Sequence, residues 1–291
     1  MDANPFDLAD AAAYRRWREA KLAGYPQRLE QLLVEVRDPR VLSPAEHDAI
    51  LRLCRKTNMA VYASSRGAAP DKGIVRAFGR QFGLERLDDN LGADADAVTS
   101  LTIQSDALHQ GYIPYTDRPI AWHTDGYYNP PERQIHGLLL HCVRPAAAGG
   151  ENELLDPEIA YLLLRDQDPE HIRALMHPDA MAIPPNIADG REIRPRQSGP
   201  VFRVRPDGSL HMRYTARTRS IEWRDDASTR AAVACLERIL KQPSAWHFRA
   251  RLEAGQGLIS NNVLHTRSRF SDGEHPRLLY RARYYERIRG T

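Results

Sequence analysis

The segment Trp122-His123-Thr124-Asp125-Gly126 sets an imidazole and a carboxylate one residue apart, and a further histidine, His265, follows far downstream. Residues at i and i+2 of an extended strand point to the same side, so His123 and Asp125 can face a single metal ion. A distant strand that carries His265 would close the same face. Two histidines and one carboxylate suit non-haem Fe(II), because three coordination positions stay open for a cosubstrate and O₂.

A His-x-Asp spacing alone occurs by chance in a chain with 11 histidines and 38 acidic residues. Support comes from the downstream segment Pro276-Arg277-Leu278-Leu279-Tyr280-Arg281. If this segment is a strand, Arg277, Arg281 and Arg283 share one face with Leu279, and inward-facing arginines need an anionic occupant to offset their desolvation. A single arginine is more often solvated at the surface. Beside the His and Asp, however, this row predicts a carboxylate site, because the guanidinium fork matches a carboxylate.

Four segments in this order resemble the taurine dioxygenase (TauD/TfdA) family of Fe(II)- and 2-oxoglutarate-dependent oxygenases: Trp122 to Asp125, Ala148 to Asn152, Leu264 to Arg267, and Arg277-x-x-x-Arg281. The resemblance implies that His123, Asp125 and His265 bind the iron. It implies that Arg277 pairs with the distal carboxylate of 2-oxoglutarate and that Arg281 lies near its metal-bound carboxylate. Asn152 departs from the threonine of taurine dioxygenase, but an amide can also donate to a carboxylate, so we include it as a cosubstrate residue.

The expected fold is α+β with a mainly β core, a double-stranded β-helix (jelly roll) buttressed by helices. The resemblance implies this fold, and short strands separated by turns suit it. We expect one domain over residues 1–291, because sheet barrels of this length commonly form one unit. Residues 1–40 are expected to form a helical arm, with its helix over 11–33. Residues 180–245 or so are expected to be an insertion between core strands.

Local patterns predict the individual elements. Ser43-Pro44-Ala45-Glu46 combines an N-cap, a proline at N1 and a capping-box glutamate, and opens a helix toward Lys56. Further helices are predicted over 71–82, from Asp156 through Arg165, and over 227–241. Strands are predicted over 97–103, 137–142, 257–260 and 277–286, with a hairpin of 200–205 and 209–214 around Pro206-Asp207-Gly208.

The resemblance implies that 2-oxoglutarate is decarboxylated to succinate and CO₂ while a C–H bond of a small polar or anionic metabolite is hydroxylated. Tyr127, Tyr128 and Asn129 directly follow the ligand segment and Trp122 precedes it, so these four are the candidate substrate residues, with Tyr128 first by family analogy. Each aromatic residue alone is more often a packing residue. Eight arginines crowd residues 191–219, and one or two of them could reach the site and hold an anionic substrate.

Several alternatives stay open at this point. The same iron site could give desaturation, epoxidation or C–heteroatom cleavage, or serve an oxygenase that needs no 2-oxoglutarate. A catalytically silent jelly-roll binding protein would be expected to lack a ligand or an arginine, and this chain lacks neither. A zinc hydrolase also uses two histidines and one carboxylate, but the arginine pair fits a keto acid better. Histidines 136, 141 and 211 lack the motif context of ligands.

Composition limits the remaining classes. A formal charge of +3 from 41 basic and 38 acidic residues argues against nucleic-acid binding as the main function. The N-terminus lacks the pattern of a signal peptide and no apolar run reaches membrane length, so we expect a cytoplasmic protein without a membrane partner. The three cysteines, Cys54, Cys142 and Cys235, predict packing rather than disulfides or zinc. A homo-oligomer is possible on this sequence.

Overall fold

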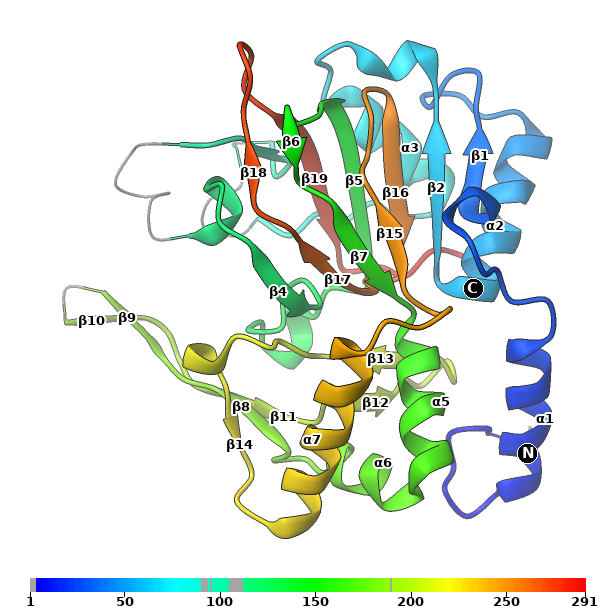
Figure 1. The fold of residues 1–291 in the computed structure, drawn as a ribbon, viewed down its shortest axis with the longest axis vertical. Helices are drawn as coiled ribbons and strands as arrows, with labels where there is room; N and C mark the ends of the chain where they lie inside the picture. The colour runs from blue at the N-terminus through cyan, green and yellow to red at the C-terminus, as the bar shows by residue number, and fades with distance from the viewer. Residues whose placement is uncertain (1–3, 90–93, 95, 105–111, 189) are drawn as a thin grey trace.

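Two facing β-sheets form the centre of the computed structural model, which describes residues 4–89, 94, 96–104, 112–188 and 190–291 (Figure 1). The larger sheet has the strand order β1-β2-β16-β5-β19-β3 and the smaller one β15-β7-β17-β4. The strands of the larger sheet are Leu33–Glu35 (β1), Met59–Ala63 (β2), Thr99–Leu101 (β3), Gly137–Arg144 (β5), Gln256–Ser260 (β16) and Leu278–Tyr284 (β19). The smaller sheet comprises Ile120–His123 (β4), Asn152–Leu155 (β7), Phe248–Ala250 (β15) and Leu264–Arg267 (β17). This is the expected jelly roll.

Strand β5 shows why the larger sheet forms. Its run Leu138-Leu139-Leu140 is buried, and it is paired on both sides, with β16 and β19. Leu138 and Leu140 face the core between the sheets, whereas Leu139 packs in a second cluster under the helices. A strand covered on both faces reads as a continuous apolar run rather than an alternating one.

Helices cover the outside of the larger sheet and the lower end of the molecule. Ser43 and Glu46 form the predicted capping box, and the helix that they open ends at Asn58 in the left-handed conformation. The helices are Ala11–Leu22 (α1), Pro44–Thr57 (α2), Gly73–Gln81 (α3), Pro157–Gln167 (α5), Pro169–Leu175 (α6) and Ala227–Lys241 (α7). The four predicted helices are confirmed as α2, α3, α5 and α7. No helix in the described part of the chain is long and apolar enough to cross a membrane.

The prediction of one helix over 11–33 is wrong in its second half. Helix α1 ends at Leu22, Gly24 adopts a positive φ of 62°, and Leu29–Leu32 forms a 3-10 turn. Leu33–Glu35 then becomes β1, which pairs in parallel with β2. The arm is therefore attached to the main sheet, and it is helical only as far as Leu22.

Between α6 and β15 the chain forms a layer of short strands closed by α7. These strands are Met181–Ile183 (β8), Asn186–Ala188 (β9), Arg191–Arg194 (β10), Gln197–Gly199 (β11), Phe202–Val204 (β12), Leu210–Met212 (β13) and Glu222–Trp223 (β14). The hairpin predicted around Pro206-Asp207-Gly208 is confirmed, since β12 and β13 pair in antiparallel fashion. We call residues 181–241 the insertion. It returns to the core where Thr215 forms a bridge with His123 at the open edge of β4.

Candidate iron and cosubstrate site

Strands β4 and β17 bring the two candidate histidine ligands together. His265 lies opposite His123 in the antiparallel register, and the two rings have centroids 4.2 Å apart. Asp125 follows β4 directly, and its Oδ1 lies 3.4 Å from Nε2 of His123. One ligand atom from each of the three residues lies within 4.8 Å of the others. The three side chains thus converge as the sequence predicts.

Local hydrogen bonds orient both imidazoles. Nδ1 of His123 lies 2.9 Å from the carbonyl oxygen of Ala121, and Nδ1 of His265 lies 2.9 Å from that of Val263. Because a carbonyl only accepts, each Nδ1 must carry the hydrogen, which leaves the Nε2 lone pair free for a metal. Burial, with His123 beside it, lowers the pKa of His265 to about 4, so this ring is neutral and ready to ligate at pH 7.

The carboxylate of Asp125 is held in place from the backbone. Asn262 accepts a hydrogen bond from the Asp125 amide and donates to its carbonyl. Burial acts to raise the pKa of Asp125, but the charge of Arg281 holds it well below its usual range. Oδ2 of Asp125 is buried and has no hydrogen-bond partner among the described residues. An ionised oxygen that accepts no hydrogen bond, beside two free imidazole nitrogens, fits a divalent cation.

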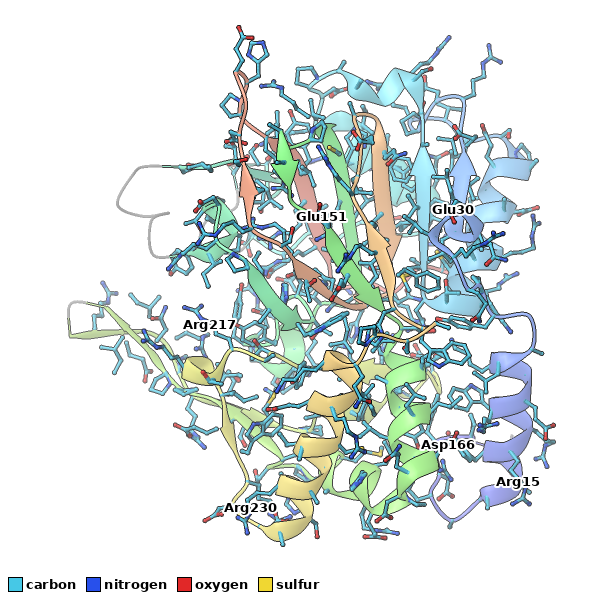
Figure 2. The ribbon with its side chains drawn as sticks, in the orientation of Figure 1. Arg15, Glu30, Glu151, Asp166, Arg217 and Arg230 are labelled. Atoms are coloured by element: carbon cyan, nitrogen blue, oxygen red, sulfur yellow. The ribbon has the colours of Figure 1, made fainter. Side chains whose placement is uncertain are left out.

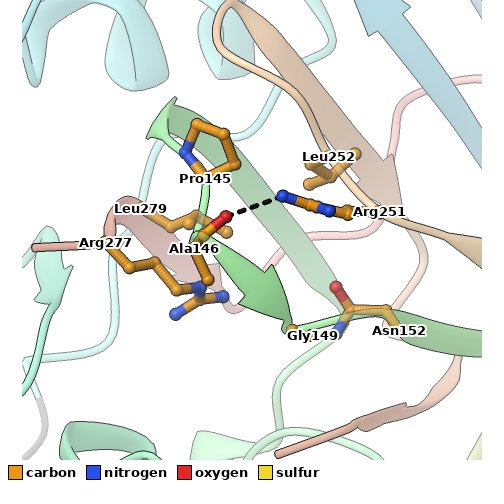
Figure 3. A pocket seen from close by; sticks show the side chains of 9 residues that line it. Pro145, Ala146, Gly149, Asn152, Arg251, Leu252, Arg277 and Leu279 are labelled. Atoms are coloured by element: carbon orange, nitrogen blue, oxygen red, sulfur yellow. Dashed lines mark hydrogen bonds between the residues drawn. The ribbon is translucent and has the colours of Figure 1, made fainter. Parts of the chain in front are cut away.

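A small pocket beside this cluster fits a carboxylate (Figure 3). Arg277 is 4% exposed, and its Nη1 is buried with no hydrogen-bond partner among the described residues. Asn152 lines the same pocket and donates from Nδ2 to the carbonyl of Thr266 at 2.6 Å, which leaves its second N–H available. Gly149 turns the chain here with a positive φ of 74°. A larger residue would not fit, because its Cβ would lie 2.1 Å from the Arg269 carbonyl oxygen. An unpaired buried guanidinium nitrogen fits the distal carboxylate of 2-oxoglutarate.

The inward row of arginines predicted for β19 is present. Arg277, Arg281 and Arg283 are all buried. Nη1 of Arg281 lies 3.4 Å from Oδ2 of Asp125. Arg283 instead pairs with Asp88, a residue that the sequence pattern did not single out. Asp88 lies in a loop, and nothing in its local sequence links it to the site.

The sequence matches the family described as taurine catabolism dioxygenase TauD, TfdA family over residues 28–283. The chain belongs to this family. It is therefore an Fe(II)- and 2-oxoglutarate-dependent dioxygenase.

Two curated relatives are each named uridine-5′-phosphate dioxygenase. One, from an Amycolatopsis species, is 28% identical over 283 residues, which cover 90% of this chain and 100% of the relative. The other, from a Streptomyces species, is 31% identical over 203 residues, covering 65% of this chain and 69% of the relative. Among solved structures, AAD-2 in complex with Mn(II) and N-oxalylglycine shares the fold, with a TM-score of 0.62 at 14% identity over 90% of this chain and 96% of that one.

Two of the candidate substrate residues of the dioxygenase contact each other directly after the ligand segment. Tyr127 and Tyr128 are half-buried and meet edge to face, with ring centroids 5.2 Å apart. Asn129 is buried, and its Nδ2 donates to the Arg133 carbonyl, so its amide stabilises the turn after the ligand segment.

The choice of Trp122 as a substrate residue is wrong for the geometry of this dioxygenase. Its side chain packs against His247 at 5.6 Å between ring centroids, within the apolar core. Neighbouring residues of a strand point to opposite faces. Because His123 faces the metal cluster, Trp122 faces away from it.

Two arginines of the insertion lie against these two tyrosines, and we call the four side chains Tyr127, Tyr128, Arg194 and Arg217 the mouth. The Arg194 guanidinium lies 5.8 Å from the centre of the Tyr128 ring, and its Nη atoms donate only to the carbonyls of Pro184 and Pro195. Figure 2 shows Arg217 beside the end of β4, and it contacts Tyr127. Among the described residues, no carboxylate lies within 4.0 Å of either guanidinium. Two cations without acidic partners, beside the tyrosines that follow the ligand segment, suit an anionic substrate.

Other members of the arginine-rich stretch have structural roles. Arg213 is buried and donates to the Met181 and Gly199 carbonyls, and Arg196 pairs with Glu222 at the surface. His141 is a satisfied core residue, because its ring nitrogens contact the Tyr62 hydroxyl and the Gly67 carbonyl. The three cysteines are buried and unpaired, as predicted.

Proposed function

We propose that this dioxygenase hydroxylates the phosphate-bearing C5′ carbon of a nucleoside 5′-phosphate, with uridine-5′-phosphate as the first candidate. In this proposal His123, Asp125 and His265 hold Fe(II), and Arg277 binds the distal carboxylate of 2-oxoglutarate. Asn152 and Arg281 assist at the cosubstrate. The observation that carries the choice of substrate is the pair of acid-free arginines, Arg194 and Arg217, at the mouth of the iron site. The names of the two relatives point to the same substrate class.

The balance of charge supports a dianionic substrate. The four buried arginines Arg267, Arg277, Arg281 and Arg283 outnumber the buried carboxylates Asp88 and Asp125 by two positive charges. Fe(II) adds two positive charges, and 2-oxoglutarate takes two away. The two mouth arginines then leave an excess of positive charge that a phosphate monoester offsets. A neutral metabolite would leave these guanidinium groups without an anion.

The expected outcome follows from the position of the oxidised carbon. Iron and 2-oxoglutarate, when bound, supply the oxidant as O₂ is consumed and succinate and CO₂ are released. The residues of the chain orient the substrate and exclude water. Hydroxylation of a CH₂ group that carries a phosphate oxygen gives an ester of an aldehyde hydrate. This species loses its hydroxyl proton, breaks the C–O bond and releases inorganic phosphate and an aldehyde.

The test is a coupled assay of succinate and inorganic phosphate with Fe(II), 2-oxoglutarate and uridine-5′-phosphate. We expect equal amounts of both products, no phosphate from the His265→Ala variant, and little succinate with uridine. Release of succinate without release of phosphate would mean that the substrate is hydroxylated or desaturated and that its C–O bond stays intact. No stimulation of succinate by any nucleoside 5′-phosphate would refute the proposed substrate class.

A further inference from the structure

We infer that Asp88, acting through Arg283, makes the Tyr128 hydroxyl a hydrogen-bond donor to the anionic group of the substrate. The inference rests on the proposed function only for the identity of that anion. In this arrangement Tyr128 contacts the substrate, whereas Asp88 and Arg283 are positioning residues.

Arg283 lies on the face of β19 that points toward the iron site. Its neighbours Tyr280, Ala282 and Tyr284 pack in the cluster under the helices, so Arg281 and Arg283 occupy the opposite face. Arg281 contacts Asp125, and Arg283 follows two residues later, about 7 Å further along the strand. The Arg283 side chain is 3% exposed. Its guanidinium group is therefore buried beside the metal cluster.

Asp88 holds this guanidinium group in one orientation. Oδ2 of Asp88 pairs with Nη2 of Arg283, and the Asp88 side chain is 1% exposed. Its Oδ1 accepts from the Tyr285 hydroxyl at 2.7 Å and from Nη2 of Arg133 at 3.3 Å. The backbone N–H of Asp88 also donates to the Arg283 carbonyl at 2.8 Å. A buried ion pair with both carboxylate oxygens occupied has little freedom to reorient.

The remaining contact of Arg283 determines the role of Tyr128. Nη1 of Arg283 donates to the Tyr128 hydroxyl oxygen at 2.9 Å. Because arginine has donors and no acceptor, the Tyr128 hydrogen cannot point back at Arg283. The other cation at the ring, Arg194, is also a donor only. No acceptor for this hydroxyl is found among the described residues, and Tyr128 is half-buried, so water accepts its hydrogen in the free protein and a bound anion can take the place of that water.

Asp88 also explains why Arg283 itself does not take the anion. The carboxylate offsets the charge of Arg283 and occupies Nη2, while Nε is buried and has no hydrogen-bond partner among the described residues. In this proposal the half-buried Tyr128 hydroxyl, and not the buried guanidinium group, meets the substrate. A phenol hydroxyl donates one directed hydrogen bond, whereas a free guanidinium group would hold any nearby anion, including the Asp125 carboxylate, more strongly. The Asp88–Arg283 ion pair thus keeps Arg283 from competing for the ligand Asp125 and leaves substrate binding to Tyr128.

The test compares the wild type with three variants, Tyr128→Phe, Asp88→Asn and both together. Two matched control variants accompany them. The controls are Tyr280→Phe, a buried tyrosine on the other face of β19, and Asp89→Asn, whose exposed carboxylate binds only Arg133. Thermal melts establish that each variant is folded. The readouts are KM for uridine-5′-phosphate, KM for 2-oxoglutarate, and anaerobic binding of uridine-5′-phosphate to the protein loaded with Fe(II) and 2-oxoglutarate.

We expect Tyr128→Phe to raise KM and Kd for uridine-5′-phosphate by about tenfold, because one hydrogen bond to a charged group is lost. Asp88→Asn should have the same effect, because the freed Arg283 turns toward the Asp125 carboxylate and no longer fixes the Tyr128 hydroxyl. KM for 2-oxoglutarate should stay unchanged, and the double variant should bind no more weakly than Tyr128→Phe. Wild-type affinity in Tyr128→Phe, or additive losses in the double variant, would overturn the inference while the proposed function stands.

A wild type that does not bind uridine-5′-phosphate would instead refute the proposed function. Inorganic phosphate then serves as the probe of the Tyr128 hydroxyl in the same loaded protein. Weaker phosphate binding by Tyr128→Phe than by Tyr280→Phe would support the inference, and equal binding would overturn it.

Discussion

Nη1 of Arg281 lies 3.4 Å from Oδ2 of Asp125, and the two side chains are 10% and 4% exposed. A buried carboxylate beside a buried guanidinium group is stable as an ion pair, but either group alone would be left with an uncompensated charge. Arg281 therefore allows Asp125 to stay ionised in the interior, where a metal can use it. The same carboxylate therefore serves both iron binding and the stability of the apoprotein.

Replacing Asp125 by alanine should remove iron binding and destabilise the apoprotein by about 3 kcal/mol or more, because Arg281 loses its partner. Equilibrium dialysis with Fe(II) and urea unfolding of the apoprotein measure the two effects. Asp117→Ala is the control, since Asp117 pairs with Arg269 at the surface. Retained Fe(II) affinity in the Asp125 variant would contradict the assignment.

Arg277→Gln should raise KM for 2-oxoglutarate by at least about tenfold, because glutamine loses the charge and the forked donors that meet the distal carboxylate. Arg251→Gln is a matched control. Arg251 lines the same pocket but donates to the Ala146 carbonyl at 2.7 Å, as Figure 3 shows. Equal effects of the two substitutions would mean that Arg277 has no special place in cosubstrate binding.

Arg217→Gln should raise KM for uridine-5′-phosphate by about fivefold to tenfold and leave KM for 2-oxoglutarate unchanged, because only the mouth of the site loses a cation. The effect should shrink as ionic strength rises. Arg230→Gln on the exposed face of α7 serves as the control. An equal loss for uridine and its 5′-phosphate would argue against a contact with phosphate.

Lys21→Met should destabilise the protein by about 3 kcal/mol at pH 7. Nζ of Lys21 lies 2.7 Å from Asp156 and 2.5 Å from Glu158, so the variant leaves the buried Asp156 and the half-buried Glu158 without their cation. The control is Lys241→Met, which breaks an exposed pair with Glu237 and should change stability by about 0.5 kcal/mol or less. Urea unfolding measures both.

The same cluster has a defined pH dependence. Burial acts to raise the pKa of Glu158, but Lys21 keeps it below the usual 4.5, so its contribution to stability is present above that pH and is lost as the pH falls through the depressed pKa. Burial acts to lower the pKa of Lys21, but Asp156 and Glu158 raise it above 10.5, and that contribution is lost only in strong base. The difference between wild type and Lys21→Met should therefore be largest between pH 5 and 10 or so. A difference that grows in acid would contradict this.

The pairing of His123 with Asp125 could be predicted because its information is local, whereas the assignment of His265 depended on the resemblance to the family. Alternation along a strand puts His123 and Asp125 on one side, and the same rule applied to Trp122 would have excluded it from the substrate residues. Alternation also predicts the inward row on β19. It does not predict the partner of Arg283, because Asp88 reaches it from a loop 195 positions away.

Short strands, the cellular location, the oligomeric state and contacts made by loops were harder to predict. Leu33–Glu35 contains too few residues to show a strand pattern, and its pairing with β2 depends on the rest of the sheet. The cytoplasmic location, the possible homo-oligomer and the single-domain boundaries remain predictions from sequence. Loop-mediated contacts such as Asp88 with Arg283 form only in the tertiary structure.

The bridge between His123 and Thr215 limits how substrate preference could be exchanged between family members. The Thr124 amide donates to the Tyr214 carbonyl, and the Ala216 amide donates to that of Trp122, so residues 214–216 act as a further strand beside the metal ligand. Replacing the whole insertion by that of another family member would remove these backbone hydrogen bonds and disturb the position of the ligand His123. A chimera that retains residues 214–216 and exchanges only the segment around the β9–β10 hairpin would change the mouth while keeping the ligand strand paired.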